Sequence, residues 1–214
     1  MTNFDKILSY FDELFPDAEC ALNFSTPYEL LVAVILSAQC TDKRVNVVTN
    51  ELFKVANTPA KMLELGEEKL KPIIFPCGFY NNKSKAILKT SKALIERFDG
   101  NLPSDLETLT SLDGVGRKTA NVVIANAFGG QTIAVDTHVH RVSTRLGLTS
   151  ESSTPYQCEM DLLQIVPYDR RSKFHHQMIL FGRNVCKAIK PNCEVCKLKD
   201  ICKYYKNVNN KKKG

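Results

Sequence analysis

The sequence predicts an all-α protein, and three observations carry this prediction. Apolar residues recur at helical spacing, helix-start signals repeat along the chain, and no segment alternates apolar and polar residues long enough for a sheet. The 214 residues are 43% hydrophobic and 24% charged, a composition typical of globular proteins that excludes wholesale disorder. We expect about ten short helices and no internal repeat.

The expected helices follow one another from the N-terminus. The first is amphipathic, and its apolar stripe comprises Phe4, Ile7, Leu8, Phe11, Leu14 and Phe15. Later helix starts combine a capping side chain with a following proline or with an acid or amide three residues on; they lie at Thr26, Thr58, Ser104 and Thr154. Asp136 is expected to cap a helix that ends near Gly147, and apolar stripes predict helices over residues 82–98 and 172–186.

The charge of the chain is unevenly distributed. The formal net charge is +6, and residues 183–214 alone hold ten basic and two acidic side chains. A basic chain end often contacts a polyanion, although a solvated lysine tail from Lys203 onward is the alternative. No apolar run approaches the ~20 residues that span a bilayer, and the N-terminal residues do not form a targeting signal. We therefore expect a soluble, cytoplasmic protein.

Four of the eight cysteines fall within one short segment: Cys186, Cys193, Cys196 and Cys202. Short loops can bring four sulfurs to one point at little entropic cost, so this segment predicts a metal centre. Paired Cys-x2-Cys knuckles are typical of zinc, but only one such pair is present; the wide, unequal spacing favours a 4Fe–4S cluster, with zinc as the alternative. The other four lie among apolar neighbours and are expected to be reduced core thiols: Cys20, Cys40, Cys77 and Cys158.

A glycine-rich turn lies at residues 112–119, which read Leu-Asp-Gly-Val-Gly-Arg-Lys-Thr. Gly114 and Gly116 let backbone amides approach an anion, and the turn leads into a helix N-terminus that favours negative charge. The spacing fits neither a P-loop nor a dinucleotide-binding fingerprint. What remains is a helix-hairpin-helix over about residues 106–127, which grips a DNA backbone without reading sequence, or an ordinary turn between helices.

Lys118 and Asp136 are the candidate catalytic residues. The positive end of the helix dipole, neighbouring Arg117 and partial burial would all disfavour the charged form of Lys118, and a neutral amine can act as a nucleophile through a Schiff base. Asp136 is a carboxylate that could stabilise a cationic sugar while it caps a helix.

Taken in order, these motifs resemble the bacterial endonuclease III family of helix-hairpin-helix DNA glycosylase/AP lyases. The hairpin with Lys118, then Ile-Ala-Val-Asp-Thr-His at residues 133–138, then Cys-x6-Cys-x2-Cys-x5-Cys carry the resemblance, which covers nearly the whole chain. It implies a helix-hairpin-helix glycosylase fold with a six-helix barrel at residues 20–130. A second helical domain would combine residues 1–19 with 131–214 and hold the 4Fe–4S cluster loop at 186–202.

The resemblance also implies the activity and its residues. The substrate would be double-stranded DNA that contains a damaged pyrimidine or an abasic site, and the protein would act as a monomer. Lys118 would be the nucleophile and Asp136 the catalytic carboxylate. The residues expected to contact DNA are Gln39, Phe79, Gly114, Gly116, Arg117, His138, Lys187 and Lys190. Within this set, Gln39 would fill the gap left by an extruded base, and Phe79 would be the wedge on the other strand.

Some residues depart from the family's pattern, and other functions stay open. Asp113 stands where proline is usual, Cys40 where alanine is common, and Phe79 where an aliphatic residue is usual. The alternatives are a sister glycosylase with another base specificity, a non-catalytic iron–sulfur DNA sensor, and a structural zinc protein. Lys118 argues against the first, because the adenine-removing relatives lack it, and a sensor would need neither Lys118 nor Asp136.

Overall fold

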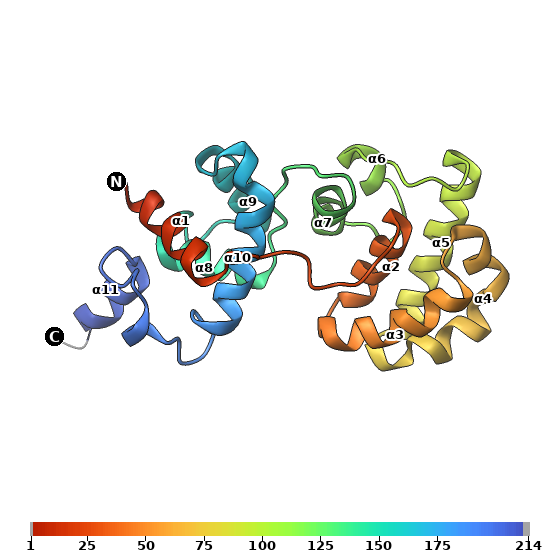
Figure 1. Cartoon of the computed structure of the whole chain (residues 1–214), viewed down its shortest axis with the longest axis horizontal. Helices are drawn as coiled ribbons and strands as arrows, with labels where there is room; N and C mark the ends of the chain where they lie inside the picture. Colours follow the sequence, from red (N-terminus) through yellow and green to blue (C-terminus); the bar gives the residue numbers. More distant parts are fainter. Residues whose placement is uncertain (1, 212–214) are drawn as a thin grey trace. The chain divides into compact units, whose positions relative to one another are not determined.

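The computed structural model describes residues 2–211 and confirms an all-helical chain, with no strand among those residues. The basic tail reaches Lys212 and Lys213, which lie outside the described residues. None of the helices described is both long and apolar enough to cross a membrane. The chain divides into two compact units: a central unit, Cys20–Gly130, and a terminal unit, Met1–Glu19 with Gln131–Gly214 (Figure 1).

The central unit contains six α-helices and one short 3₁₀-helix. Their bounds are α2 Pro27–Ser37, α3 Asp42–Val55, α4 Pro59–Ile74, η1 Phe75–Cys77, α5 Tyr80–Phe98, α6 Leu106–Thr110 and α7 Arg117–Ala127. Helix α2 is buried on every side from Tyr28 to Leu36, and it packs against α3, α5 and α7. A helix that is apolar all round belongs inside a unit, and α2 is therefore the centre around which the others are arranged.

The terminal unit joins the N-terminal helix to the C-terminal part of the chain. Its helices are α1 Asn3–Leu14, α8 Thr137–Leu146, α9 Pro155–Ile165, η2 Tyr168–Arg170, α10 Arg171–Asn184, η3 Cys193–Val195 and α11 Lys203–Lys211. Helix α1 packs on α10 through Phe11, whose ring centroid lies 5.7 Å from that of Phe174 and 5.0 Å from that of Phe181. Asp12 reinforces this contact by accepting hydrogen bonds from Arg170 and Gln177.

Most expected helix starts are confirmed. The Thr26 and Thr58 hydroxyls accept from the third amide of their helices, and Thr154 with Gln157 forms a complete capping box. The expectation that Ser104 caps a helix is wrong. Asp105 caps α6 instead, because its carboxylate accepts from the Thr108 amide at 2.8 Å, and a carboxylate is the stronger acceptor at a positive helix end.

Candidate functional site

The hairpin between α6 and α7 is fixed against α5. Gly114 has φ +77°, and a Cβ built on it would lie 2.6 Å from the Ala86 Cβ on α5. The Thr90 hydroxyl, also on α5, donates to the Asp113 carbonyl. Glycine is therefore required at this position for two reasons, the left-handed backbone and the close packing against Ala86. The contacts with α5 hold the backbone amides of the turn in fixed positions.

Helix α7 presents an open N-terminus. Gly116 is its N-cap residue in an extended conformation, and no side chain caps the helix. Arg117 is half-buried, whereas Lys118, at the second helical position, is exposed. The expected partial burial of Lys118 is therefore not observed. Asp113 lies 3.8 Å from Lys89 in an exposed ion pair, so the lysine offsets part of the negative charge that this carboxylate brings to the turn.

Gln39 and Phe79 both have left-handed backbones. Gln39 has φ +53° and Phe79 has φ +49°, values that residues other than glycine rarely adopt. The Phe79 side chain is 62% exposed, although it is a large apolar group. Both residues line one surface pocket of the central unit, together with Gly114 and Thr119. The structure thus brings three of the expected DNA contacts to one place.

Asp136 caps α8 in the terminal unit. Its Oδ1 accepts from the amides of His138 and Val139, each at 2.8 Å. No other hydrogen bond of this carboxylate is seen among residues 2–211, so Oδ2 is available to a ligand. The two amide hydrogen bonds therefore fix the carboxylate at the start of α8.

His138 is oriented by a neighbour on the same helix. The Arg141 guanidinium lies 3.1 Å from its Nδ1 and also donates to the Gly182 carbonyl, so the ring is held between α8 and α10. Burial lowers the pKa of His138, and nearby Asp136 opposes that shift. Gly182 on α10 packs closely here, with a built Cβ only 3.0 Å from the His138 Cβ. Burial therefore favours the neutral form of this imidazole near the start of α8.

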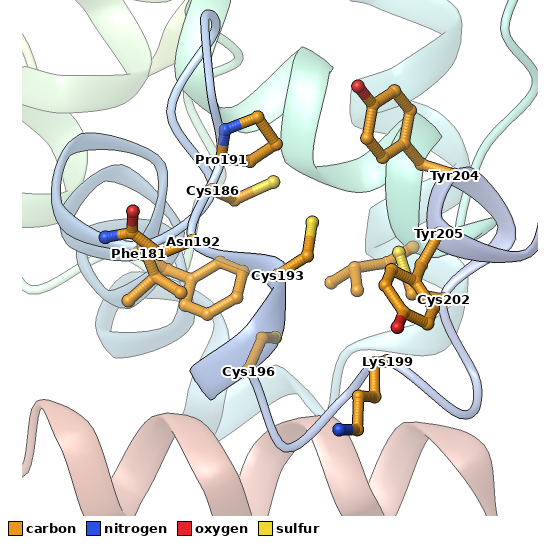
Figure 2. A pocket seen from close by; sticks show the side chains of 12 residues that line it. Phe181, Cys186, Pro191, Asn192, Cys193, Cys196, Lys199, Cys202, Tyr204 and Tyr205 are labelled. Atoms are coloured by element: carbon orange, nitrogen blue, oxygen red, sulfur yellow. The ribbon is translucent and has the colours of Figure 1, made fainter. Parts of the chain in front are cut away.

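The four clustered cysteines line one pocket of the terminal unit (Figure 2). Cys186 follows the end of α10, Cys193 and Cys196 bracket η3, and Cys202 precedes α11. Burial raises the pKa of Cys193, Cys202 and Cys196, the last to about 11. Thiols that resist ionisation in a shared pocket would be stabilised as thiolates by a cationic metal group. Among the described residues, however, no three His, Cys, Asp or Glu side chains converge as ligands of a single ion.

Two arginines of α8, which none of the sequence motifs indicates, hold the segment from Cys186 to Cys202, called the cysteine segment below. Arg145 donates to the carbonyls of Lys187 at 2.7 Å and Ala188 at 3.0 Å, and its Nη1 lies 3.5 Å from the Cys186 sulfur. Arg141 donates to the Cys186 carbonyl at 3.2 Å. A cation in the last turn of a helix is a recognisable signal, but its partners lie some forty residues away and cannot be found from sequence.

The loop after Cys186 carries the two lysines expected to contact DNA. Lys187 and Lys190 are both exposed, and Lys190 has a left-handed backbone with φ +51°. Between them Ile189 is 82% exposed. Because Arg145 fixes the backbone of this loop, the exposed side chains of the loop have a defined support.

The expected site residues are divided between the two units. Lys118 belongs to the central unit, whereas Asp136, His138 and the cysteine segment belong to the terminal unit.

The amino-acid sequence of the chain is similar to those of base excision DNA repair proteins. Residues 32–168 match the family model described as the HhH-GPD superfamily of base excision DNA repair proteins. The chain is 48% identical to endonuclease III of Escherichia coli K12 over 204 residues, which are 95% of this chain and 96% of the relative. It is 47% identical to endonuclease III of Rickettsia conorii over 204 residues, which are 95% of this chain and 97% of the relative.

Solved structures show the same similarity. An endonuclease III trapped as a covalent intermediate with DNA is 44% identical, has a TM-score of 0.92, and covers 98% of this chain and 99% of its own. A non-covalent endonuclease III–DNA complex is 43% identical with a TM-score of 0.93, at the same two coverages. A thermostable thymine-DNA glycosylase shares the fold alone, with 22% identity and a TM-score of 0.87.

Proposed function

Because the chain belongs to the endonuclease III family, within the HhH-GPD superfamily of base excision DNA repair proteins, we propose that it excises oxidised pyrimidines from double-stranded DNA. We further propose that it nicks the strand through Lys118. Its biochemical class is that of a base-excision DNA glycosylase with AP lyase activity. The role of Lys118 is supported by its position. It is exposed in the first turn of α7, whose N-terminus has no side-chain cap and follows a turn that is fixed to α5.

The Lys118 amine would attack C1′ of the damaged nucleotide, and the base would leave with the bonding electron pair. Opening of the sugar ring then yields a protonated Schiff base between Lys118 and C1′. This iminium acidifies C2′, so loss of a C2′ proton expels the 3′-phosphate by β-elimination and the strand is nicked. Water finally hydrolyses the Schiff base and returns the amine.

Asp136 would stabilise the cationic character that develops at the sugar and would help to move protons. The free Oδ2 supports this role, because the helix cap uses only Oδ1. His138, which Arg141 and Gly182 hold near the start of α8, would contact the DNA backbone. A fixed carboxylate facing a developing cation needs no reorganisation during the reaction.

Extrusion of the damaged base must precede this chemistry and costs a few kcal/mol. Gln39 and Phe79 would offset part of that cost by entering the vacated stack, and the exposure of the Phe79 ring supports this use. The amides of Gly114 and Gly116 and the side chains of Arg117, Lys187 and Lys190 would bind phosphates. The DNA contacts therefore come from the hairpin, the turns at Gln39 and Phe79, and the cysteine segment.

Cys186, Cys193, Cys196 and Cys202 would hold a 4Fe–4S cluster. The position of all four thiols around one pocket supports a shared metal group, and their wide, unequal spacing in the sequence favours a cluster over a single zinc ion. A bound cluster would supply four bonds that fix the geometry of the basic loop. That loop would then present Lys187 and Lys190 to the DNA.

Borohydride trapping on an abasic duplex tests the proposed function. A reductant that converts the Schiff base into a stable amine should give a covalent adduct with the wild-type protein and none with Lys118→Ala. Lys89→Ala is the matched control, since Lys89 is an exposed lysine near the same turn; it should form the adduct normally. Absence of any adduct from folded wild-type protein would reject the lyase mechanism and favour a DNA-binding sensor.

A further inference from the structure

The two turns proposed to invade the DNA stack have unfavourable backbones. Gln39 and Phe79 each adopt the left-handed region, which costs of the order of 1 kcal/mol or more for a residue with a Cβ. Such a conformation persists only where the surroundings over-determine it. Each residue follows closely on a helix end: Gln39 comes after the C-cap of α2, and Phe79 comes after the C-cap of η1. Surrounding groups must therefore hold each helix end in place, and one group that contacts both ends would serve for both.

Lys83 on α5 is that group. Its ammonium is buried, with only 5% of the residue exposed, and it donates three hydrogen bonds. The acceptors are the carbonyls of Leu36 at 2.9 Å, Ala38 at 2.7 Å and Cys77 at 2.9 Å. An ammonium group has three N–H donors, and here each has its own carbonyl partner. No carboxylate is among these partners, so the site is built for a cation by helix ends alone.

The three carbonyls are those that a helix leaves without an internal partner. Leu36 and Ala38 end α2, and Cys77 ends η1. The negative end of the helix dipole favours a cation there and offsets part of the cost of removing the charge from water, although burial still lowers the pKa of Lys83. Lys83 also holds Phe79 through its backbone, because its amide donates to the Phe79 carbonyl at 3.0 Å. One residue thus bonds to both turns at once.

We propose that Lys83 is a positioning residue for base extrusion: its buried ammonium joins the end of α2 to the end of η1 and so holds Gln39 and Phe79 ready to enter the DNA stack. The inference rests on the proposed function, because it assigns Lys83 to the extrusion step of that reaction. Lys83 lines the same pocket as Gln39 and Phe79, but its bonds face the protein, and it acts through those two residues. Pre-organised turns would avoid ordering two loops at the moment of extrusion.

Lys83→Met tests the proposal, since it keeps most of the side-chain volume and removes all three donors. DNA affinity should stay within about twofold, because Lys83 contributes no exposed charge, while the single-turnover rate of excision should fall about 10- to 100-fold, the loss expected from a misplacement of about 1 Å. A duplex with 2-aminopurine beside the lesion, which fluoresces when its neighbour leaves the stack, should lose most of its extrusion signal. Lys85→Met, at an exposed position of the same helix, should leave all three measurements unchanged.

A double-mutant cycle separates positioning from general destabilisation. If Lys83 acts through the wedge, then Lys83→Met should lower the rate much less in a Phe79→Ala background than in the wild-type protein. The proposal would be overturned if Lys83→Met lowered the excision rate by the same factor in both backgrounds while thermal melting showed a folded protein. A normal extrusion signal from Lys83→Met would overturn it as well. If Lys83→Met does not fold, Lys83→Gln, whose amide keeps two donors, serves in the same cycle.

The proposed function and this inference fail in different ways. Wild-type protein that neither excises a lesion nor extrudes a base would reject the proposed function. Wild-type protein that does both, beside a folded Lys83→Met variant that extrudes the base as well, would reject only the role of Lys83.

Discussion

Asp136 caps α8, and we propose that the same side chain also takes part in the reaction. One carboxylate oxygen accepts the two amides that start α8, and the other has no hydrogen bond among the described residues. The two tasks can be separated by substitution, because asparagine is as good an N-cap as aspartate but carries no charge.

Asp136→Asn should therefore keep the fold and lose the reaction. We expect thermal stability and DNA affinity close to wild type, while single-turnover excision falls about 100-fold or more, as when a preorganised charge is removed from a transition state. Asp136→Ala should also lose the cap, which lowers the free energy of unfolding by about 1 kcal/mol. Thermal melting and excision rates, measured on both variants, check this. An Asn variant with normal turnover would remove the carboxylate from the mechanism.

Single residues differ in how far the sequence predicts them. Motif order and residue type are enough to nominate Lys118, Asp136 and the four clustered cysteines. The left-handed backbones of Gln39 and Phe79 cannot be predicted in this way, because neither residue type favours that conformation. Lys83 gives no signal at all, since a lysine on an amphipathic helix is usually solvated and its three acceptors lie on two other elements.

The cysteine segment is the least regular element of the structure. Between the end of α10 and the start of α11, its only helical turn is η3. It is held by hydrogen bonds from Arg145 and Arg141, by backbone hydrogen bonds of its own turns, and by Leu198, which is 2% exposed and belongs to the core of the terminal unit. The proposed cluster would add bonds to four points of a segment that has little regular secondary structure, so its loss should loosen the segment.

Loss of a cysteine ligand should disorder this segment and spare the central unit. Purified wild-type protein should contain iron and acid-labile sulfide in equal amounts, and Cys193→Ser should lose both. The variant should also be cleaved by protease within residues 186–202 at least ten times faster, because cleavage follows the population of the open segment. Cys20→Ser, which lies in the central unit, is the control. Zinc without iron in an anaerobic preparation would contradict the cluster.

Helix boundaries show why elements are easier to predict than their connections. The threonine caps with a following proline at Thr26, Thr58 and Thr154 are local signals, and the structure confirms them, the last as a capping box. The start at Ser104 was wrong because two adjacent residues, Ser104 and Asp105, can both cap, and the sequence does not decide between neighbours. The bonds that hold the cysteine segment to α8 are long-range, and no periodicity encodes them.

At the scale of the whole molecule, the position of charge matters more than its sum. The net charge of +6 arises from residues 183–214, whereas the preceding residues are slightly acidic overall. Much of the remaining charge is already paired, as in Lys54 with Glu51 and Lys92 with Glu96. Sequence reveals this imbalance, but only the structure shows which lysines stand exposed on a loop that Arg145 holds in place.

The salt dependence of DNA binding should therefore depend on two lysines. Replacing both Lys187 and Lys190 by alanine should reduce the slope of log K against log salt by up to about 2, because each lost phosphate contact releases one counterion fewer. Replacing Lys54 and Lys92 instead removes the same formal charge from exposed positions that already pair with glutamates, and should change the slope little. Titrations of an abasic-analogue duplex at several salt concentrations measure both slopes. If the slope falls by the same amount in both double variants, DNA binding depends on the total charge of the protein, and the two lysines of the cysteine segment do not contact phosphates.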